Sequence, residues 1–410
     1  MRTLYAGADV FDGTGAPPAT ADVVVENGRI LDVGPGLDGD AAVDLTGATL
    51  LPGLIDCHVH VTVDGIDTLK RLAAPYSLRY FQTARNLGAL LDAGLTTVRD
   101  AGGADLGVKA AVDGGVVRGP RLRIAITMLS QTGGHADPWL PSGACTPALP
   151  ATPGVPPPVV DGVDEMRRRV RELVRAGADW IKVAASGGVM SPGTDPRRAQ
   201  FTPDELRTAV AEAAAAGLGV MAHAQAGPGI RNAITAGARS IEHGVYLDDD
   251  LIALMRERGT VLVPTLLAPR SVLDAAASGA AFSERSRAKV AEIMEAHDDS
   301  FRRAVAAGVP VAMGTDAIGY PHGRNLEELE LMRAGGMSPL QALHAATGAA
   351  AALLGLADDL GTIAPGRRAD LVAVRGAATD LTGLRERILL VVKDGRSAAG
   401  LSTSEERRSA

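Results

Sequence analysis

Two histidines lie two positions apart in an apolar run, PGLIDCHVHV, which spans residues 52–61. Alternate side chains of a β-strand point to the same face, so the rings of His58 and His60 project together. Neutral imidazole is a preferred ligand of zinc and of related divalent metals. The pair therefore predicts a metal site, provided that other strands bring further ligands to the same point.

Further candidate ligands lie at or just beyond later apolar runs. His135 follows RLRIAI, His223 ends GVMAHA, His243 ends SIEHG and Asp316 ends VAMGTD. Taken singly, each is typical of a polar residue at the edge of a sheet. Taken together, they predict that ligands from separate strands converge on one metal centre.

Lys182 lies inside another apolar run, WIKVAA, between Ile181 and Val183. The chain has only five lysines but thirty-six arginines, so a lysine inside an apolar run is not explained by the composition of the chain. A buried ammonium without a partner is unfavourable and tends to lose its proton. The neutral amine can add carbon dioxide to form a carbamate, whose two oxygens can bridge two divalent metals. The alternative is a lysine paired with an acid in the protein interior.

The elements that must position these side chains are short apolar runs alternating with helical patterns. Eight runs begin at Leu54, Thr96, Arg121, Trp180, Gly219, Ser240, Val261 and Val311. Between them, Thr202-Pro203 and Ser338-Pro339 begin two of the helices, with Glu205 and Gln341 completing capping boxes. The order predicts an α/β fold, a (β/α)8 TIM barrel over residues 53–361, with the active site at the carboxyl ends of its strands. An open parallel sheet is the alternative.

The two ends of the chain have a different pattern, in which short strand-like runs are separated by turn residues. Asn27-Gly28 and Asp394-Gly395 are strong hairpin signals. We expect residues 1–52 and 362–410 to fold together as a small β-sandwich domain.

Composition limits the class of protein. The chain has 410 residues, 46% of them hydrophobic, and a formal net charge of −7, which argues against a nucleic-acid partner. No apolar run reaches the length of a membrane span, no signal peptide is evident, and two cysteines are too few for a disulfide framework. We expect a cytoplasmic protein acting on a small molecule, with homo-oligomerisation left open.

Several motifs resemble those of the amidohydrolase superfamily. They are GLIDCHVH, ADWIKVAASGGVMSPGTDP, MAHA, SIEHG, GTDA and GTIAPGRRADLV, in the family's order along nearly the whole chain to about Val374. SQTGGHADPW and EHGVYLDDD are similar to the imidazolonepropionase-like or Xaa-Pro-dipeptidase-like branch, which includes metal-dependent dipeptidases.

The resemblance implies a role for each candidate ligand. His58, His60 and Asp316 bind one metal, His223 and His243 bind a second, and carbamylated Lys182 bridges the two, with a hydroxide between them. The metals are assigned as zinc, although manganese and cobalt suit the same ligands. Asp316 carries the proton from the nucleophile to the leaving nitrogen, and His135 polarises the carbonyl of an amide substrate such as a dipeptide or an N-acyl amino acid.

Substrate contacts are less well defined. Gln225 occupies the place of a tyrosine that engages the substrate carboxylate in dipeptidases of this branch, which puts dipeptide specificity in doubt. Tyr246, Arg324 and His322 follow barrel strands and are candidate substrate contacts, as are Arg197, Arg198 and Arg270. Among the other residues, His344 is expected to be structural, His297 to lie on a solvated helix face and Cys57 to lie in the core. The loop over residues 141–163 is a candidate lid.

Two alternatives to a binuclear amide hydrolase remain. The first is a hydrolase or deaminase of cyclic amides that uses one metal, as imidazolonepropionase does; it leaves Lys182 unexplained. The second is a catalytically silent barrel that acts as a binding scaffold, which conflicts with the complete set of six metal ligands.

Overall fold

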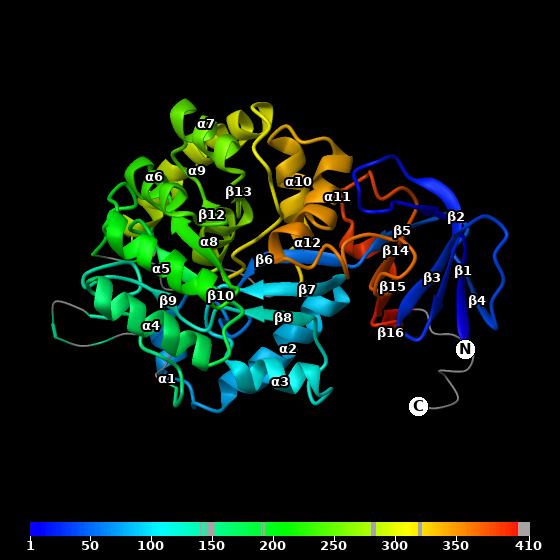
Figure 1. Cartoon of the computed structure of the whole chain (residues 1–410), viewed down its shortest axis with the longest axis horizontal. Coiled ribbons are helices and arrows are strands. Elements are labelled where there is room, and N and C mark those ends of the chain that lie inside the picture. Colours follow the sequence, from blue (N-terminus) through cyan, green and yellow to red (C-terminus); the bar gives the residue numbers. More distant parts are fainter. Residues whose placement is uncertain are drawn as a thin grey trace.

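The structure is a computed structural model of the chain, and it describes residues 1–139, 142–143, 145, 152–189, 191, 193–279, 284–318 and 322–400. Two groups of strands lie side by side in Figure 1. Strands from the two ends of the chain form one group, and parallel strands with their helices form the other. No helix among the described residues combines the length and the apolar character needed to cross a membrane.

The ends of the chain share one hydrogen-bonded sheet, in the order β16-β15-β14-β5-β1-β2-β3 with β4 paired to β1. Its strands are β1 (Arg2–Val10), β2 (Ala19–Glu26), β3 (Arg29–Gly34), β4 (Ala41–Asp44), β5 (Ala48–Pro52), β14 (Leu371–Arg375), β15 (Ile388–Lys393) and β16 (Arg396–Gly400), with a 3-10 turn at Arg385–Arg387. Both expected hairpins are present, because Asn27, Gly28, Asp394 and Gly395 all have the positive φ that such turns require. The predicted association of the two chain ends is therefore observed.

The middle of the chain alternates parallel strands with helices. The strands are β6 (Leu54–Val59), β7 (Leu95–Asp100), β8 (Arg121–Ile124), β9 (Met128–Leu129), β10 (Trp180–Ala184), β11 (Gly219–Ala224), β12 (Ser240–His243) and β13 (Val261–Val263). They form a three-stranded sheet, β6-β7-β8, and a five-stranded sheet, β13-β12-β11-β10-β9. Every pair is parallel, as expected for strands connected through helices.

Two of the eight predicted strands differ in the structure. The third, expected over residues 121–126, ends at Ile124 as β8, because Ile126 has a φ of 65°; a separate short strand, β9, follows at Met128–Leu129. The eighth, beginning at Val311, makes isolated bridges rather than a strand; Pro310 at its start has no N–H to donate. This segment still connects the two sheets, since Ala312 N donates to Leu262 O (3.0 Å) of β13 and Cys57 N of β6 donates to Met313 O (2.8 Å).

The helices surround the parallel strands in Figure 1. They are α1 (Thr68–Ala73), α2 (Leu78–Asp92), α3 (Leu106–Asp113), α4 (Val163–Arg175), α5 (Pro203–Ala215), α6 (Gly227–Ala236), α7 (Asp249–Arg258), α8 (Leu267–Ala277), α9 (Glu284–Ala306), α10 (Glu327–Ala334), α11 (Pro339–Ala345) and α12 (Gly348–Leu354). The capping boxes predicted at Thr202 and Ser338 are both present. The apolar pattern after Ser338 breaks at Thr347, so it forms two helices, α11 and α12.

Candidate active site

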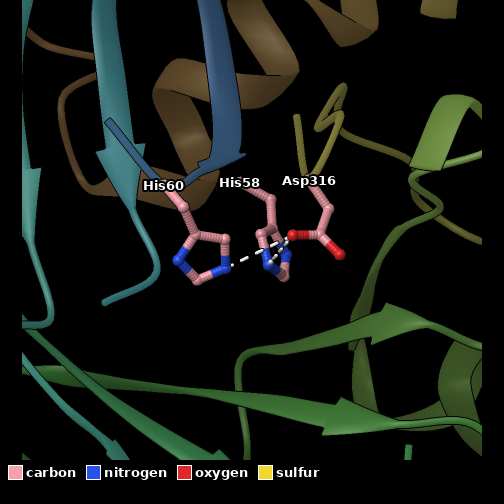
Figure 2. Close-up of side chains that lie close together, drawn as sticks. All are labelled: His58, His60 and Asp316. Atoms are coloured by element: carbon pink, nitrogen blue, oxygen red, sulfur yellow. Dashed lines mark ion pairs between the residues drawn. The ribbon is translucent and has the colours of Figure 1, made fainter. Parts of the chain in front are cut away.

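Three predicted ligands lie together where β6 ends. His58 is in β6 and His60 directly follows it, while Asp316 reaches them from the segment beyond Val311. His60 Nε2 lies 3.3 Å from Asp316 Oδ1, and His58 Nε2 lies 3.7 Å from the same oxygen. Figure 2 shows the three side chains pointing toward one another. One ligand atom from each lies within 4.8 Å of the others, an arrangement suited to a divalent cation.

Local backbone geometry directs Asp316 to this point. Its φ is 48°, an uncommon left-handed conformation for a residue other than glycine, and its N–H donates to His58 O (2.7 Å). The neighbouring Thr315 is fixed as well, because its hydroxyl donates to Asp56 Oδ2 (2.7 Å). The carboxylate is therefore held against β6 by contacts between distant parts of the chain.

The remaining predicted histidines extend the same cluster. His223 lies in β11 and His243 ends β12, with ring centroids 4.7 Å apart, and His243 lies 5.3 Å from the ring of His58. The ring of His135 stacks on His223 at 4.2 Å. Five imidazoles from four segments therefore form one contiguous group, as the sequence predicted. Within the described part of the chain, the ligand atoms of His58, His60 and Asp316 are the ones close enough to form a three-residue group.

Lys182 is buried in β10 with 1% of its surface exposed. Its Nζ has no hydrogen-bond partner among the residues that the structure describes. Burial lowers the pKa of this amine to about 8, and the negative charges of Glu242 and Asp316 only partly oppose that effect. A buried amine without a partner fits the expected carbamate, which would supply oxygen ligands at this place, better than the alternative of a lysine paired with an acid.

One nitrogen of each clustered imidazole is already occupied. The pairs are His58 Nδ1 with Glu242 Oε2 (2.7 Å), His60 Nδ1 with Gly102 O (2.8 Å), His223 Nε2 with Gly187 O (3.1 Å), His243 Nδ1 with Thr265 Oγ1 (2.7 Å) and His135 Nδ1 with Ser191 Oγ (2.6 Å). Such partners orient a metal-binding imidazole and leave its second nitrogen to the metal. The donor set therefore fits a metal centre in orientation as well as in composition.

Electrostatics favours the protonation states that bind a metal at most of these residues; the exception is His60, where burial is outweighed by the bond to Asp316, which raises the pKa. Burial lowers the pKa of His58 to about 4, and it lowers the pKa values of His223 and His243 well below 6.5. Burial alone would raise the pKa of Asp316, but the neighbouring His58 and His60 hold it below its usual value. Neutral imidazoles beside an ionised carboxylate are the forms that coordinate divalent metals.

The loop that follows β9 fixes His135. Gly133 has a φ of 69°, and a side chain at Gly134 would lie 2.3 Å from Ser130 Oγ, so both glycines are needed there. His135 N donates to Gln200 Oε1 (3.0 Å). Burial lowers the pKa of His135 to about 4, so the imidazole is neutral near pH 7.

The expected substrate contacts differ in their surroundings. Gln225 Oε1, the Tyr246 hydroxyl and His322 Nδ1 are buried and have no hydrogen-bond partner among the described residues, so they remain candidates. Arg324 instead forms an ion pair with Glu327 (2.6 Å).

The other candidate arginines also have acidic neighbours. Arg197 pairs with Glu292 and lies over the ring of Tyr246, Arg270 pairs with Asp298 (2.7 Å), and Arg198 lies 3.9 Å from Asp195. Much of the candidate lid (residues 141, 144 and 146–151) lies outside the described residues.

The expectation for His297 was wrong. Its exposed fraction is 2%, and its Nε2–H donates to His243 O (3.0 Å). This face of α9 packs on the loop after β12, where Ser300 Oγ also donates to Val245 O (2.7 Å). Cys57 is fully buried, as predicted, and His344 Nδ1–H donates to Gly13 O (2.8 Å), in agreement with a structural role.

Fully buried charged residues that sequence reasoning missed include Arg99 in β7 and Glu242 in β12. Arg99 Nη2 lies 3.0 Å from Glu242 Oε1. Both stand in apolar strand segments, so the criterion that singled out Lys182 could also have found them.

Comparison with known proteins agrees with this geometry. The model of the amidohydrolase family matches residues 49–398, and the chain belongs to this family of hydrolases. Ochratoxinase of Aspergillus niger is 36% identical over 395 residues, covering 91% of this chain and 81% of that protein. Imidazolonepropionase of Salinispora arenicola is 28% identical over 407 residues, covering 90% and 89%. The crystal structure of a Xaa-Pro dipeptidase with bound methionine has a TM-score of 0.88 at 32% identity, covering 97% of this chain and 99% of that one.

Proposed function

We propose that this protein is a metal-dependent hydrolase that cleaves the C–N bond of a small amide, such as a dipeptide or an N-acyl amino acid. The observation that carries the proposal is the cluster of imidazoles and Asp316, together with the buried amine of Lys182 in β10, the strand beside β11. This amine lacks a hydrogen-bond partner among the described residues. Similarity to ochratoxinase and to a Xaa-Pro dipeptidase supports this class of reaction.

In this proposal, two divalent ions, assigned as zinc, are held by the predicted ligands. His58, His60 and Asp316 would hold one, His223 and His243 would hold the other, and carbamylated Lys182 would supply an oxygen ligand to each. When bound, such a pair acidifies a water molecule and polarises the substrate carbonyl. Lys182 Nζ is fully buried and has no partner in the part of the chain that the structure describes, which favours two ions over the single ion of the cyclic-amide alternative.

The protein's own residues supply orientation and proton transfer. Asp316 is ionised and takes the proton of the attacking water, which it then delivers to the leaving nitrogen. We assign the polarisation of the substrate carbonyl to His135 Nε2. For this role the single proton of Ser191 Oγ, which is donated to His135 O (2.7 Å), must turn to His135 Nδ1 (2.6 Å), so that the ring proton lies on Nε2.

We also infer that the two parallel sheets are parts of one closed (β/α)8 barrel, joined by the bends after Ile124 and by residues 311–317. The hydrogen bonds of Ala312 and Cys57 support this closure. The domain boundaries that follow are 53–361 for the barrel and 1–52 with 362–410 for the β-domain.

The test is a metal analysis with and without bicarbonate, followed by an assay of dipeptides and N-acyl amino acids. We expect two metals per chain and amide hydrolysis, and loss of the metal pair in Lys182→Ala. Lys70→Ala, which removes an exposed lysine of α1, is the matched control and should retain both metals. One tightly bound metal in a fully active enzyme would refute the binuclear proposal, and a metal-loaded protein inactive on every amide would support the silent scaffold.

A further inference from the structure

Arg99 is buried among the parallel strands, and none of its surface is exposed. Its Nε donates to Cys57 O (2.6 Å) of β6 and its Nη1 donates to Ser240 Oγ (3.2 Å) of β12. Its guanidinium lies over the ring of Trp180 in β10, 4.6 Å from the centroid. The side chain is therefore fixed by contacts with three strands besides its own.

Glu242 is the acidic partner of Arg99, and hydrogen bonds saturate its carboxylate. Oε1 accepts from Arg99 Nη2 (3.0 Å) and from Ser240 Oγ (2.5 Å), while Oε2 accepts from Arg99 Nη2 (3.2 Å) and from His58 Nδ1 (2.7 Å). Both oxygens accept from the guanidinium of Arg99, and each accepts a second bond, so no position is left for a proton. The group is therefore a carboxylate, which can only accept hydrogen bonds.

This arrangement determines the tautomer of His58. Because Glu242 Oε2 must accept, the proton of a neutral His58 lies on Nδ1, and Nε2 presents a lone pair. That nitrogen faces Asp316 Oδ1 at 3.7 Å. The partners of the other clustered imidazoles are carbonyl or hydroxyl oxygens, so within the described residues His58 is the clustered imidazole that has a carboxylate on its second nitrogen.

We propose that Arg99 and Glu242 are positioning residues for the metal held by His58, His60 and Asp316. Glu242 fixes the tautomer and orientation of His58, and Arg99 fixes Glu242. This inference rests on the proposed function, because it assumes that His58 binds a metal. It extends that function to two residues outside the ligand set.

A purely structural role is the alternative explanation of the pair. Buried ion pairs contribute little net stability, because the loss of hydration offsets their attraction, and apolar replacement of both partners is often neutral or stabilising. Replacing one partner alone leaves an uncompensated buried charge and destabilises the protein. Stability and metal affinity can therefore be separated by comparing single and double variants.

Glu242→Gln is the informative single variant. If the amide oxygen remains with Arg99 and Ser240, the amide NH2 group faces His58 Nδ1, which must then accept a hydrogen bond. The proton of the neutral ring moves to Nε2, the nitrogen that faces Asp316. This change of tautomer opposes coordination by His58 without removing any ligand.

The experiment compares the full-length wild type with Glu242→Gln and with the double variant Arg99→Met/Glu242→Leu. Glu205→Gln is the matched control, since Glu205 is a largely buried carboxylate that accepts a bond from Gly162 N (2.7 Å), at the start of α4. The readouts are zinc affinity by chelator competition, the absorption spectrum of the cobalt-loaded protein, and the melting temperature of the metal-free protein.

We expect both variants to bind the first metal about 10- to 100-fold more weakly than the wild type, with an altered cobalt spectrum. The double variant should melt no lower than the wild type, and Glu205→Gln should keep wild-type zinc affinity. Unchanged affinity and spectrum in both variants would overturn this inference and leave the proposed function intact. A wild type that binds no metal would overturn both.

Discussion

Replacing Lys182 with methionine should stabilise the metal-free protein. The side chain is 1% exposed, and its Nζ has no hydrogen-bond partner among the described residues. Methionine has a similar length and no charge, so it removes the buried ammonium and leaves the apolar contacts of the stem in place. The substitution should therefore stabilise the metal-free protein and abolish activity, because it also removes the amine on which the bridging ligand would form.

The magnitude follows from the pKa of the amine. Burial lowers the pKa of Lys182 from 10.5 to about 8, and each pKa unit corresponds to about 1.4 kcal/mol between the two protonation states. The charged amine therefore destabilises the folded protein by about 3 kcal/mol at pH 7, where it is mostly protonated in both states. We expect Lys182→Met to raise the free energy of unfolding of the metal-free protein by about that amount.

The assay is urea unfolding at pH 7 in the presence of a chelator, with Lys70→Met as a control at an exposed lysine. The control should change the free energy of unfolding by less than about 0.5 kcal/mol. With zinc and bicarbonate the order should reverse, because metal binding to the folded state stabilises the wild type and not the variant. A metal-free Lys182→Met protein no more stable than the wild type would show that the amine has a favourable partner, and the argument for its modification would fail.

Two other predictions concern the loop at His135 and a buried acid. A side chain at Gly188 would lie 2.1 Å from His135 Cε1, so Gly188→Ala should displace the ring and lower kcat/KM about 100-fold. The control is Gly193→Ala, which should be fully active because no described atom lies within 4 Å of the added carbon. Full activity in Gly188→Ala would exclude His135 from the reaction. Burial raises the pKa of Glu328 to about 8, although the hydrogen bonds that its carboxylate accepts from two backbone N–H groups at the start of α8 lower it. The folded protein therefore binds this proton more tightly than the unfolded chain does. Relative to Glu328→Gln, the wild type should lose about 1.4 kcal/mol of unfolding free energy per pH unit between pH 4.5 and pH 8, and parallel stability curves in urea would contradict this.

The parts of the fold that the sequence predicted well depend on local chemistry. The hairpins at Asn27-Gly28 and Asp394-Gly395 follow from residues that tolerate a positive φ, and the capping box at Thr202 follows from side chains within one turn of helix. The strand expected from Val311 depends instead on pairing with β13 and β6, which lie far away in the chain. Its regularity could not be judged from local pattern, and only its bridges form.

The residues of the candidate site divide in the same way, into those with a local signal in the sequence and those that depend on distant contacts. His223 and His243 could be found because each ends an apolar run, and parallel strands bring such ends together; His58 could be found because it alternates with His60 in one predicted strand. His297 could not, because its polar neighbours are typical of a solvated helix and its burial depends on how α9 packs against the loop after β12. Arg99 and Glu242 carried a usable signal, a charge within a strand, but their pairing requires knowledge of which strands face each other.

The backbone at the strand ends explains why the ligand positions depend on these long-range contacts. His243, Thr265 and Asp316 all have a positive φ, which is unfavourable for residues with side chains and persists only where surrounding contacts enforce it. The contacts are present: His297 donates to His243 O, and Asp316 N donates to His58 O. Because these contacts come from distant segments, the geometry of the site is a product of the assembled fold. A local loosening of α9 should therefore disturb His243 before it disturbs the strands.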